Sequence, residues 1–170
     1  MKKFEIPQVT MDMLDYFRGD FRRIAHAQKV HGFTRLVAGM EGTGEKRKKL
    51  LECAAVLHDI GIPEAIRIHG SGAHAFQEKE GARIAYDLLA GYAMDEADRM
   101  WVRDVVGAHH TYEKVEELGF RILFEADCLV NIMEKNVDDS AENVAEIRRK
   151  YFATPSALKV FDTLFFPKGP

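Results

Sequence analysis

The stretch Ala54-Ala55-Val56-Leu57-His58-Asp59-Ile60-Gly61-Ile62 decides the fold of this chain. Its first half continues an apolar helical run from Leu50, and a helix of this kind is buried on most sides. The run ends in a histidine and an aspartate, which are costly to bury unless each has a partner. A divalent metal ion would satisfy both, because imidazole nitrogen and carboxylate oxygen are common metal ligands. The alternative is a helix-capping aspartate beside a hydrogen-bonded core histidine, and the pair alone favours that alternative.

Helical periodicity dominates the whole chain, and alternating strand patterns are nearly absent. The apolar spacing, caps and glycines predict an all-α fold, a single helical bundle of about seven to nine helices. Asp20 is the expected N-cap of the helix that carries His26. The basic run 46–49 opens the next helix and is expected to be a solvent-exposed face. The expected helical ranges are 11–18, 21–39, 46–59, 63–68, 74–89, 95–107, 120–134 and 140–151, with a last helix from 155.

The length of 170 residues predicts one domain over 1–170, with the core motifs in 20–134 and C-terminal helices in 138–166. Hydrophobic residues make up 46% and charged residues 30%, a balance typical of soluble globular proteins. The apolar C-terminal helix with Phe161 and Phe165 would suit a homodimer contact. Docking onto its own domain is the simpler expectation.

Composition argues against several classes of partner. The net charge of −3 does not favour a nucleic-acid polymer or an anionic membrane. No stretch approaches the roughly 20 apolar residues of a transmembrane helix, and the N-terminus does not resemble a signal peptide. Cys53 and Cys128 both lie in apolar helical patterns, which indicates buried free thiols. We therefore expect a cytoplasmic protein.

Further candidate metal ligands lie in apolar helices. His26 shares a helix face with Val30 and Phe33, and Asp127 is embedded in an apolar helix. Each residue alone has an ordinary explanation, as a core histidine or as a carboxylate with a hydrogen-bond partner. With His58 and Asp59 they make four groups on three apolar helices, which would need four separate partners. One metal ion would satisfy all four.

The ordered set His26, His58-Asp59 and Asp127 resembles the HD superfamily of metal-dependent phosphohydrolases, which is all-helical and named after the His-Asp pair. Three motifs carry the resemblance: residues 23–30 are similar to the family's first-ligand helix, 57–62 to the HDIG form of its central motif and 125–127 to its final-ligand helix. The resemblance implies that His26, His58, Asp59 and Asp127 hold a divalent metal ion. The expected ion is manganese, iron, cobalt, nickel, zinc or magnesium.

The resemblance also bears on the residues between the central pair and Asp127. His109-His110 looks like the histidines that a binuclear branch of the family adds, and the resemblance implies that one of them faces the substrate phosphate. Glu78 with His110 is the candidate for a weaker second ion, whereas His74 lies a little early for that role. A polar helix C-terminus is the alternative for the two histidines, because imidazolium suits the helix dipole there.

Four other polar residues lie near these motifs. His31 competes with His26 as the first ligand, but on a helix it points about 140° away from it. Arg23 is expected to contact either the substrate phosphate or a neighbouring carboxylate. Glu64 is within reach of the site, although a surface position in a first helical turn is the simpler expectation. His69 is given no role.

The activity implied by the resemblance is hydrolysis of a small phosphorylated substrate, a phosphomonoester or phosphodiester such as a nucleotide, by a metal-activated water. Asp59 would hold the metal and orient the water or take its proton. His109 or His110 would stabilise phosphoryl oxygens or protonate the leaving group.

Two alternatives to this activity remain. One is a non-catalytic metal-binding signalling or scaffold domain, against which the complete four-residue set argues. The other is a di-iron oxygenase on the same scaffold. Gln77 and Glu78, where a histidine is expected, argue against that enzyme.

Overall fold

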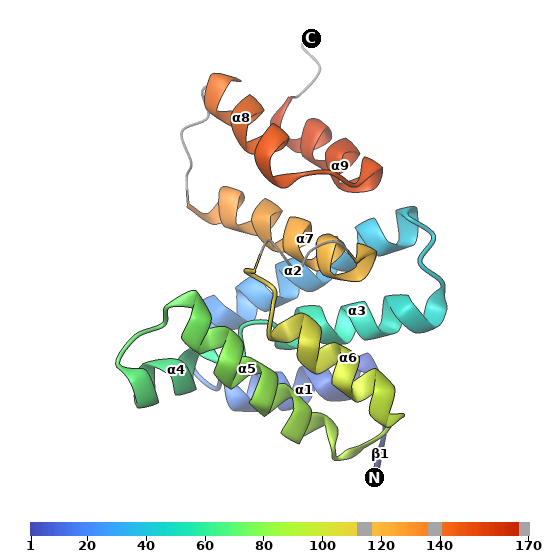
Figure 1. Ribbon diagram of the computed structural model, residues 1–170, viewed down its shortest axis with the longest axis vertical. Helices are drawn as coiled ribbons and strands as arrows, with labels where there is room; N and C mark the ends of the chain where they lie inside the picture. The colour runs from blue at the N-terminus through green and yellow to red at the C-terminus, as the bar shows by residue number, and fades with distance from the viewer. Residues whose placement is uncertain (112–116, 136–140, 167–170) are drawn as a thin grey trace.

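The computed structural model describes residues 1–111, 117–135 and 141–166, and within these ranges the fold is all-α, as predicted. The described elements are β1 (Lys2–Lys3), α1 (Ile6–Tyr16), α2 (Phe21–Met40), α3 (Glu45–Leu57), α4 (Ile62–His69), α5 (His74–Leu89), β2 (Tyr92–Ala93), α6 (Glu96–Val106), α7 (Leu118–Glu134), α8 (Ala141–Tyr151) and α9 (Pro155–Phe165). Figure 1 shows α2, α3 and α7 across the middle, with α8 and α9 at one end and α4, α5 and α6 towards the other. None of the described helices combines the length and apolar character that a membrane crossing requires.

The helix boundaries agree closely with the expected ranges except at the N-terminus. α1 begins at Ile6 rather than at residue 11, because Pro7 is accommodated in its first turn. β1 and β2 form a parallel pair that was not predicted, since two-residue strands leave no alternating pattern. Residues 138–140, which we expected to belong to the C-terminal helices, lie outside the described residues.

α3 is the buried centre of the fold. Each residue from Cys53 to Leu57 has 0% of its surface exposed. The helix packs against α1, α2, α6 and α7, so almost no face of its C-terminal half meets solvent. Its C-terminal end therefore carries His58 and Asp59 into the middle of the molecule.

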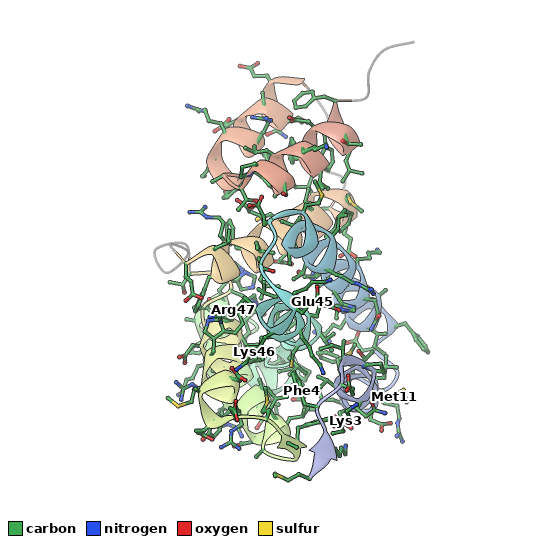
Figure 2. The ribbon with its side chains drawn as sticks, turned by 90° about the vertical axis from the view of Figure 1, so that its right-hand side faces the viewer. Lys3, Phe4, Met11, Glu45, Lys46 and Arg47 are labelled. Carbon is green, nitrogen blue, oxygen red and sulfur yellow. The ribbon has the colours of Figure 1, made fainter. Side chains whose placement is uncertain are left out.

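The basic run at the start of α3 is held by neighbouring elements. Lys46 Nζ lies 2.9 Å from Asp98 Oδ2 of α6, and Lys49 donates a hydrogen bond of 2.6 Å to the backbone carbonyl of Phe4. The Arg47 guanidinium lies 4.1 Å from the centre of the Trp101 ring. Figure 2 shows Lys46 and Arg47 on the outside of the molecule. The run thus lies at the surface, as expected, and it also ties α3 to α6 and to the N-terminal segment.

The C-terminal helix docks onto its own domain. Phe161 of α9 is fully buried and belongs to an apolar cluster with Val37 of α2 and Leu129 of α7. Glu125 of α7, also fully buried, accepts hydrogen bonds from the backbone N–H groups of Ala153 (2.6 Å) and Thr154 (3.1 Å). This carboxylate joins α7 to the turn between α8 and α9.

Gly61 permits a close backbone approach beside the His-Asp pair. A Cβ atom at Gly61 would lie 2.1 Å from the Gln77 carbonyl oxygen and 2.4 Å from the Gly81 nitrogen. Since φ of Gly61 is −77°, the glycine is required by space and not by its backbone conformation. α5 therefore packs directly against the turn that follows Asp59.

We expect Gly61→Ala to lower the free energy of unfolding by about 2 to 3 kcal/mol, because the two backbone segments must separate. Gly32→Ala in α2 is the matched control, since nothing lies within 4 Å of its Cβ position. That change should raise the free energy of unfolding by roughly 0.5 to 1 kcal/mol. Urea denaturation of both variants measures the difference, and equal stabilities would contradict the close approach.

Glu125→Ala should lower the free energy of unfolding by about 2 to 4 kcal/mol, because it leaves two backbone N–H groups without their acceptor. Glu125→Gln keeps an amide oxygen for these donors and should cost less than half as much. Thermal unfolding followed by circular dichroism compares the two. Equal losses would show that the carboxylate does not hold the turn through its oxygen.

Candidate metal centre

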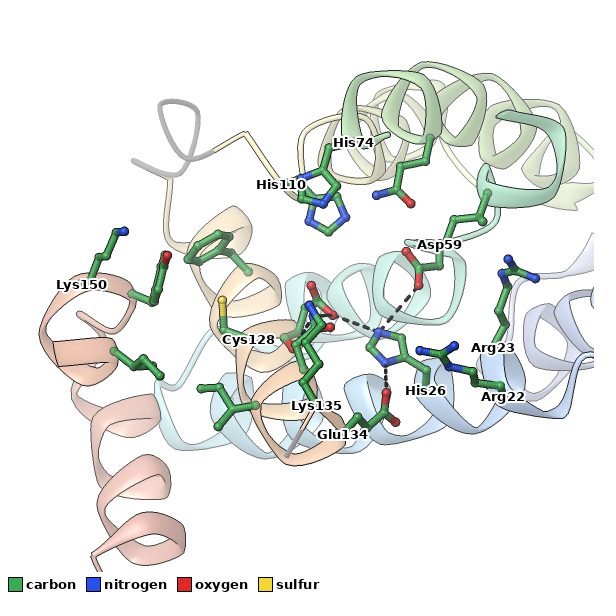
Figure 3. A pocket seen from close by; sticks show the side chains of 18 of the residues that line it. Arg22, Arg23, His26, Asp59, His74, His110, Cys128, Glu134, Lys135 and Lys150 are labelled. Atoms are coloured by element: carbon green, nitrogen blue, oxygen red, sulfur yellow. Dashed lines mark hydrogen bonds and ion pairs between the residues drawn. The ribbon is translucent and has the colours of Figure 1, made fainter. Parts of the chain in front are cut away.

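Side chains from three parts of the chain converge at the end of α3. His26 Nε2 lies 3.0 Å from Asp127 Oδ1 and 3.7 Å from Asp59 Oδ2. His58 Nε2 lies 3.5 Å from Asp59 Oδ2 and 3.8 Å from Asp127 Oδ1. Figure 3 shows His26 of α2 and Asp59 pointing towards one another at the wall of a cavity. The structure thus brings together all four residues that the sequence singled out.

These separations are of the size found around a single ion. Ligand atoms held about 2.1 Å from one metal lie roughly 3.0 to 3.5 Å from each other. The ligand atoms of His26, His58 and Asp59 all lie within 4.8 Å of one another. Buried histidine and aspartate side chains of this cluster could therefore hold a metal ion.

His58 supplies the strongest indication of a cation. Its Nδ1–H donates a hydrogen bond of 2.8 Å to the Ala55 carbonyl, so Nε2 carries the lone pair when the ring is neutral. Burial lowers the pKa of His58, which favours the neutral ring. Nε2 is buried and has no hydrogen-bond partner among the described residues. A lone pair that faces two carboxylates is unfavourable unless a positive ion lies between them.

His26 is oriented from its far side. Its Nδ1 is hydrogen-bonded at 3.0 Å to Glu134 Oε2, which directs Nε2 towards the cluster. Burial alone would lower the pKa of His26, but the hydrogen bond to Asp127 and the nearby charges raise it to about 9. The raised pKa reports a strongly negative potential at this point, which favours any bound cation.

The two aspartates are ionised. Burial alone would raise the pKa of Asp59, but the three surrounding imidazoles hold it well below its usual range. Burial likewise opposes ionisation of Asp127, and the hydrogen bond from His26 with the neighbouring imidazoles lowers its pKa. Asn131 also donates a hydrogen bond of 2.8 Å to Asp127 Oδ1.

A second group lies on the other side of Asp59. The ligand atoms of Asp59, His109 and His110 lie within 4.8 Å of one another, and His109 Nε2 is 3.6 Å from Asp59 Oδ1. His109 donates its Nδ1–H to the Val106 carbonyl at 2.6 Å, and its buried Nε2 has no hydrogen-bond partner among the described residues. Asp59 thus presents one oxygen to each group.

Glu78 is close to His110 but contacts its backbone. Glu78 Oε1 accepts a hydrogen bond of 2.8 Å from the His110 N–H, and Oε2 accepts one of 2.9 Å from the Thr111 hydroxyl. The His110 ring stacks on His74 with 3.9 Å between the ring centres. The Glu78 carboxylate therefore fixes the backbone that follows α6. The carboxylate of Asp59 lies beside the imidazole of His110.

Three other polar residues pair elsewhere. His31 Nε2 lies 2.9 Å from Glu52 Oε2 between α2 and α3, and His69 Nε2 lies 3.1 Å from Glu80 Oε1. Glu64 accepts two hydrogen bonds of 2.7 Å from Arg67 at the surface. None of the three lines the cavity at the cluster.

The cluster opens into a cavity of about 1220 Å³, whose wall includes His26, Asp59, Asp127 and His110. Arg23 lines the same cavity and pairs with Asp20 at the start of α2, so the expected ion pair is present and contact with a phosphate stays a prediction. Other cationic residues in the wall are Arg22, Lys135 and Lys150. Figure 3 shows Arg22 and Arg23 beside His26, with Lys135 on the opposite side of the ring.

Sequence reasoning missed Asn131 and Glu134, although a signal was present. They follow Asp127 by four and seven residues, so helical geometry places all three on one face of α7. Comparisons of the chain with family models, curated proteins and solved structures found no match. The candidate site therefore rests on its geometry and on the sequence motifs.

We expect His58→Ala and Asp59→Ala each to weaken metal binding by roughly 100-fold or more, because each removes a candidate ligand. Metal content measured by mass spectrometry, with circular dichroism as a check on folding, tests this. His31→Ala is the matched control, since His31 pairs with Glu52 outside the cluster. Full metal occupancy in a folded His58→Ala or Asp59→Ala variant would refute the ligand assignment.

Proposed function

We propose that this protein is a metal-dependent phosphohydrolase of the HD type that acts on a small phosphate ester. The observation that carries the proposal is the unpartnered Nε2 of buried His58, which faces two carboxylates at the wall of an accessible cavity. The resemblance of the three sequence motifs to the HD superfamily supports the same activity. His26, His58, Asp59 and Asp127 would hold the ion.

A divalent ion bound there would lower the pKa of a coordinated water and take up charge from a phosphoryl oxygen. Asp59 lies between the two groups of imidazoles, so its carboxylate is placed to orient the attacking water and to receive its proton. The ring of His110 reaches the cavity wall and would contact the phosphoryl oxygens. His109 does not line the cavity, and it would instead hold Asp59 in position.

The cavity wall carries four cationic residues and four carboxylates, so it would suit an anionic substrate once a bound cation offsets Asp59 and Asp127. Arg22, Arg23 and Lys135 lie in its wall. Cations around a concave site attract phosphate and raise its local concentration. Arg23 is held by Asp20, which positions its guanidinium beside the cluster.

The second candidate function is a di-iron oxygenase. It is favoured by the two groups that share Asp59, because a bridging carboxylate between two sets of imidazoles suits a pair of ions. We rank it below the hydrolase because Arg22, Arg23, Lys135 and Lys150 in the wall would favour a phosphorylated substrate once a bound cation offsets the carboxylates beside them. A metal-binding domain without catalysis is the remaining alternative.

Metal analysis of the purified protein, combined with a screen of phosphate release from nucleotides and simple phosphoesters under added Mn²⁺, Fe²⁺, Co²⁺, Ni²⁺, Zn²⁺ and Mg²⁺, tests the proposal. We expect metal-dependent release that falls by about 100-fold or more in Asp59→Asn, since the base and ligand are lost together. His69→Ala, which lies outside the cavity, should keep full activity.

The alternatives give different results in the same screen. Two irons per chain with an oxygen-dependent optical change and no phosphate release would replace the hydrolase by the oxygenase. Bound metal without release of phosphate from any substrate would indicate a binding domain.

A further inference from the structure

The cavity continues well beyond the cluster of histidines and aspartates. Its volume of about 1220 Å³ exceeds the roughly 300 to 1,000 Å³ of pockets that enclose drug-sized ligands. A phosphate group beside His26 and Asp59 would occupy only one end of such a space. The lining of the other end therefore carries information about the organic part of the substrate.

The far end lies between α7 and α8. From α7 its lining includes Phe124, Cys128 and Ile132, which are spaced by four residues and share one helix face. From α8 it includes Ile147 and Tyr151, again four residues apart. Figure 3 shows α8, marked by Lys150, across the cavity from His26. Two apolar helix faces thus border one continuous space that begins at the cluster.

Among the residues that the structure describes, few groups at this end could recognise a sugar or a polar ring. The amide nitrogen of Asn131 is already bonded to Asp127, at 2.8 Å to Oδ1 and 3.1 Å to the backbone carbonyl. The hydroxyl of Tyr151 and the thiol of Cys128 are the polar groups of the five residues that form the two apolar faces. A hydroxyl-rich ligand would leave its own polar groups unpaired here, which is unfavourable.

The charged residues of the cavity wall are concentrated at the end that holds His26 and Asp59. Arg22 and Arg23 lie at the end that holds His26 and Asp59, and Lys135 lies beside the same cluster (Figure 3). Lys150 is exposed on α8, and its Nζ lies 5.1 Å from the centre of the Tyr151 ring at the edge of the apolar end. With a divalent ion offsetting Asp59 and Asp127, an anionic head would favour the end at His26 and a hydrocarbon the other end.

We propose that the substrate is a phosphomonoester with an apolar organic group, alkyl or aryl, that lies between α7 and α8 while its phosphate lies at His26 and Asp59. This inference rests on the proposed phosphohydrolase function for the reaction, and on the lining of the cavity for the ligand.

Binding of non-hydrolysable methyl-, butyl- and octylphosphonate to the full chain, measured by calorimetry with Mn²⁺ present, tests the inference. Each buried methylene strengthens binding by about fourfold, so octylphosphonate should bind at least about 100-fold more tightly than methylphosphonate. Equal affinities for the three phosphonates would overturn the apolar subsite.

Filling the far end should shorten the ligand that the cavity accepts. Ile147→Trp and Ile132→Trp should each weaken octylphosphonate binding by about tenfold or more and leave methylphosphonate binding unchanged. Ile68→Trp is the matched control, because Ile68 is 48% exposed on α4 and does not line the cavity. Circular dichroism identifies any variant that fails to fold. If folded Ile147→Trp and Ile132→Trp both bind octylphosphonate as the unaltered chain does, the hydrocarbon does not lie between α7 and α8.

Phosphate release from methyl phosphate, octyl phosphate and nucleoside monophosphates, measured in parallel, separates this inference from the proposed function. Fastest release from octyl phosphate supports both. Equal release from methyl and octyl phosphate, or faster release from nucleoside monophosphates, retains the hydrolase and overturns the apolar group. Tight binding of octylphosphonate without release from any ester retains the apolar subsite and overturns the hydrolase.

Discussion

The constraint on which the site depends is the burial of the His58 imidazole with one nitrogen already committed. Because Nδ1–H is bonded to the Ala55 carbonyl of its own helix, only Nε2 is left to face Asp59 and Asp127. A neutral ring cannot donate a hydrogen bond from both nitrogens. The lone pair of Nε2 therefore faces the carboxylate oxygens of Asp59 and Asp127, which are also hydrogen-bond acceptors. Such an arrangement is stable when a cation is shared between them, and this is why the cluster is interpreted as a metal centre.

The fold serves this arrangement by burying the C-terminal half of α3 on nearly every side. Its apolar residues pack against four other helices, which leaves the end of the helix no freedom to turn His58 towards solvent. The turn after Asp59 is confined as well, because Gly61 lies against the backbone of α5. The rigidity of both segments places the imidazole and the carboxylate before any ligand binds, and preorganised ligands bind a metal with less loss of entropy.

Much of this was accessible from the sequence. The all-α class, the helix around His26, the short helix after Gly61 and the docking of the C-terminal helix followed from periodicity, caps and apolar content. The early start of α1 and the two short strands did not, because a proline in a first helical turn resembles a break and a two-residue strand has no period. The cavity between α7 and α8 also left no signal, since its lining residues look like ordinary core positions of two separate helices.

The sequence by itself determined which side chains must be buried: an apolar run that ends in His58-Asp59, with His26 and Asp127 in other apolar helices, predicts a shared site. Only the tertiary structure decided how these groups face one another. It showed that Asp59 presents one oxygen to each set of imidazoles and that Glu134 holds the far side of His26. It also placed Glu78 on the backbone of His110. The physical reason is that periodicity reports the direction of a side chain from its own helix, whereas distances between helices depend on the packing of all of them.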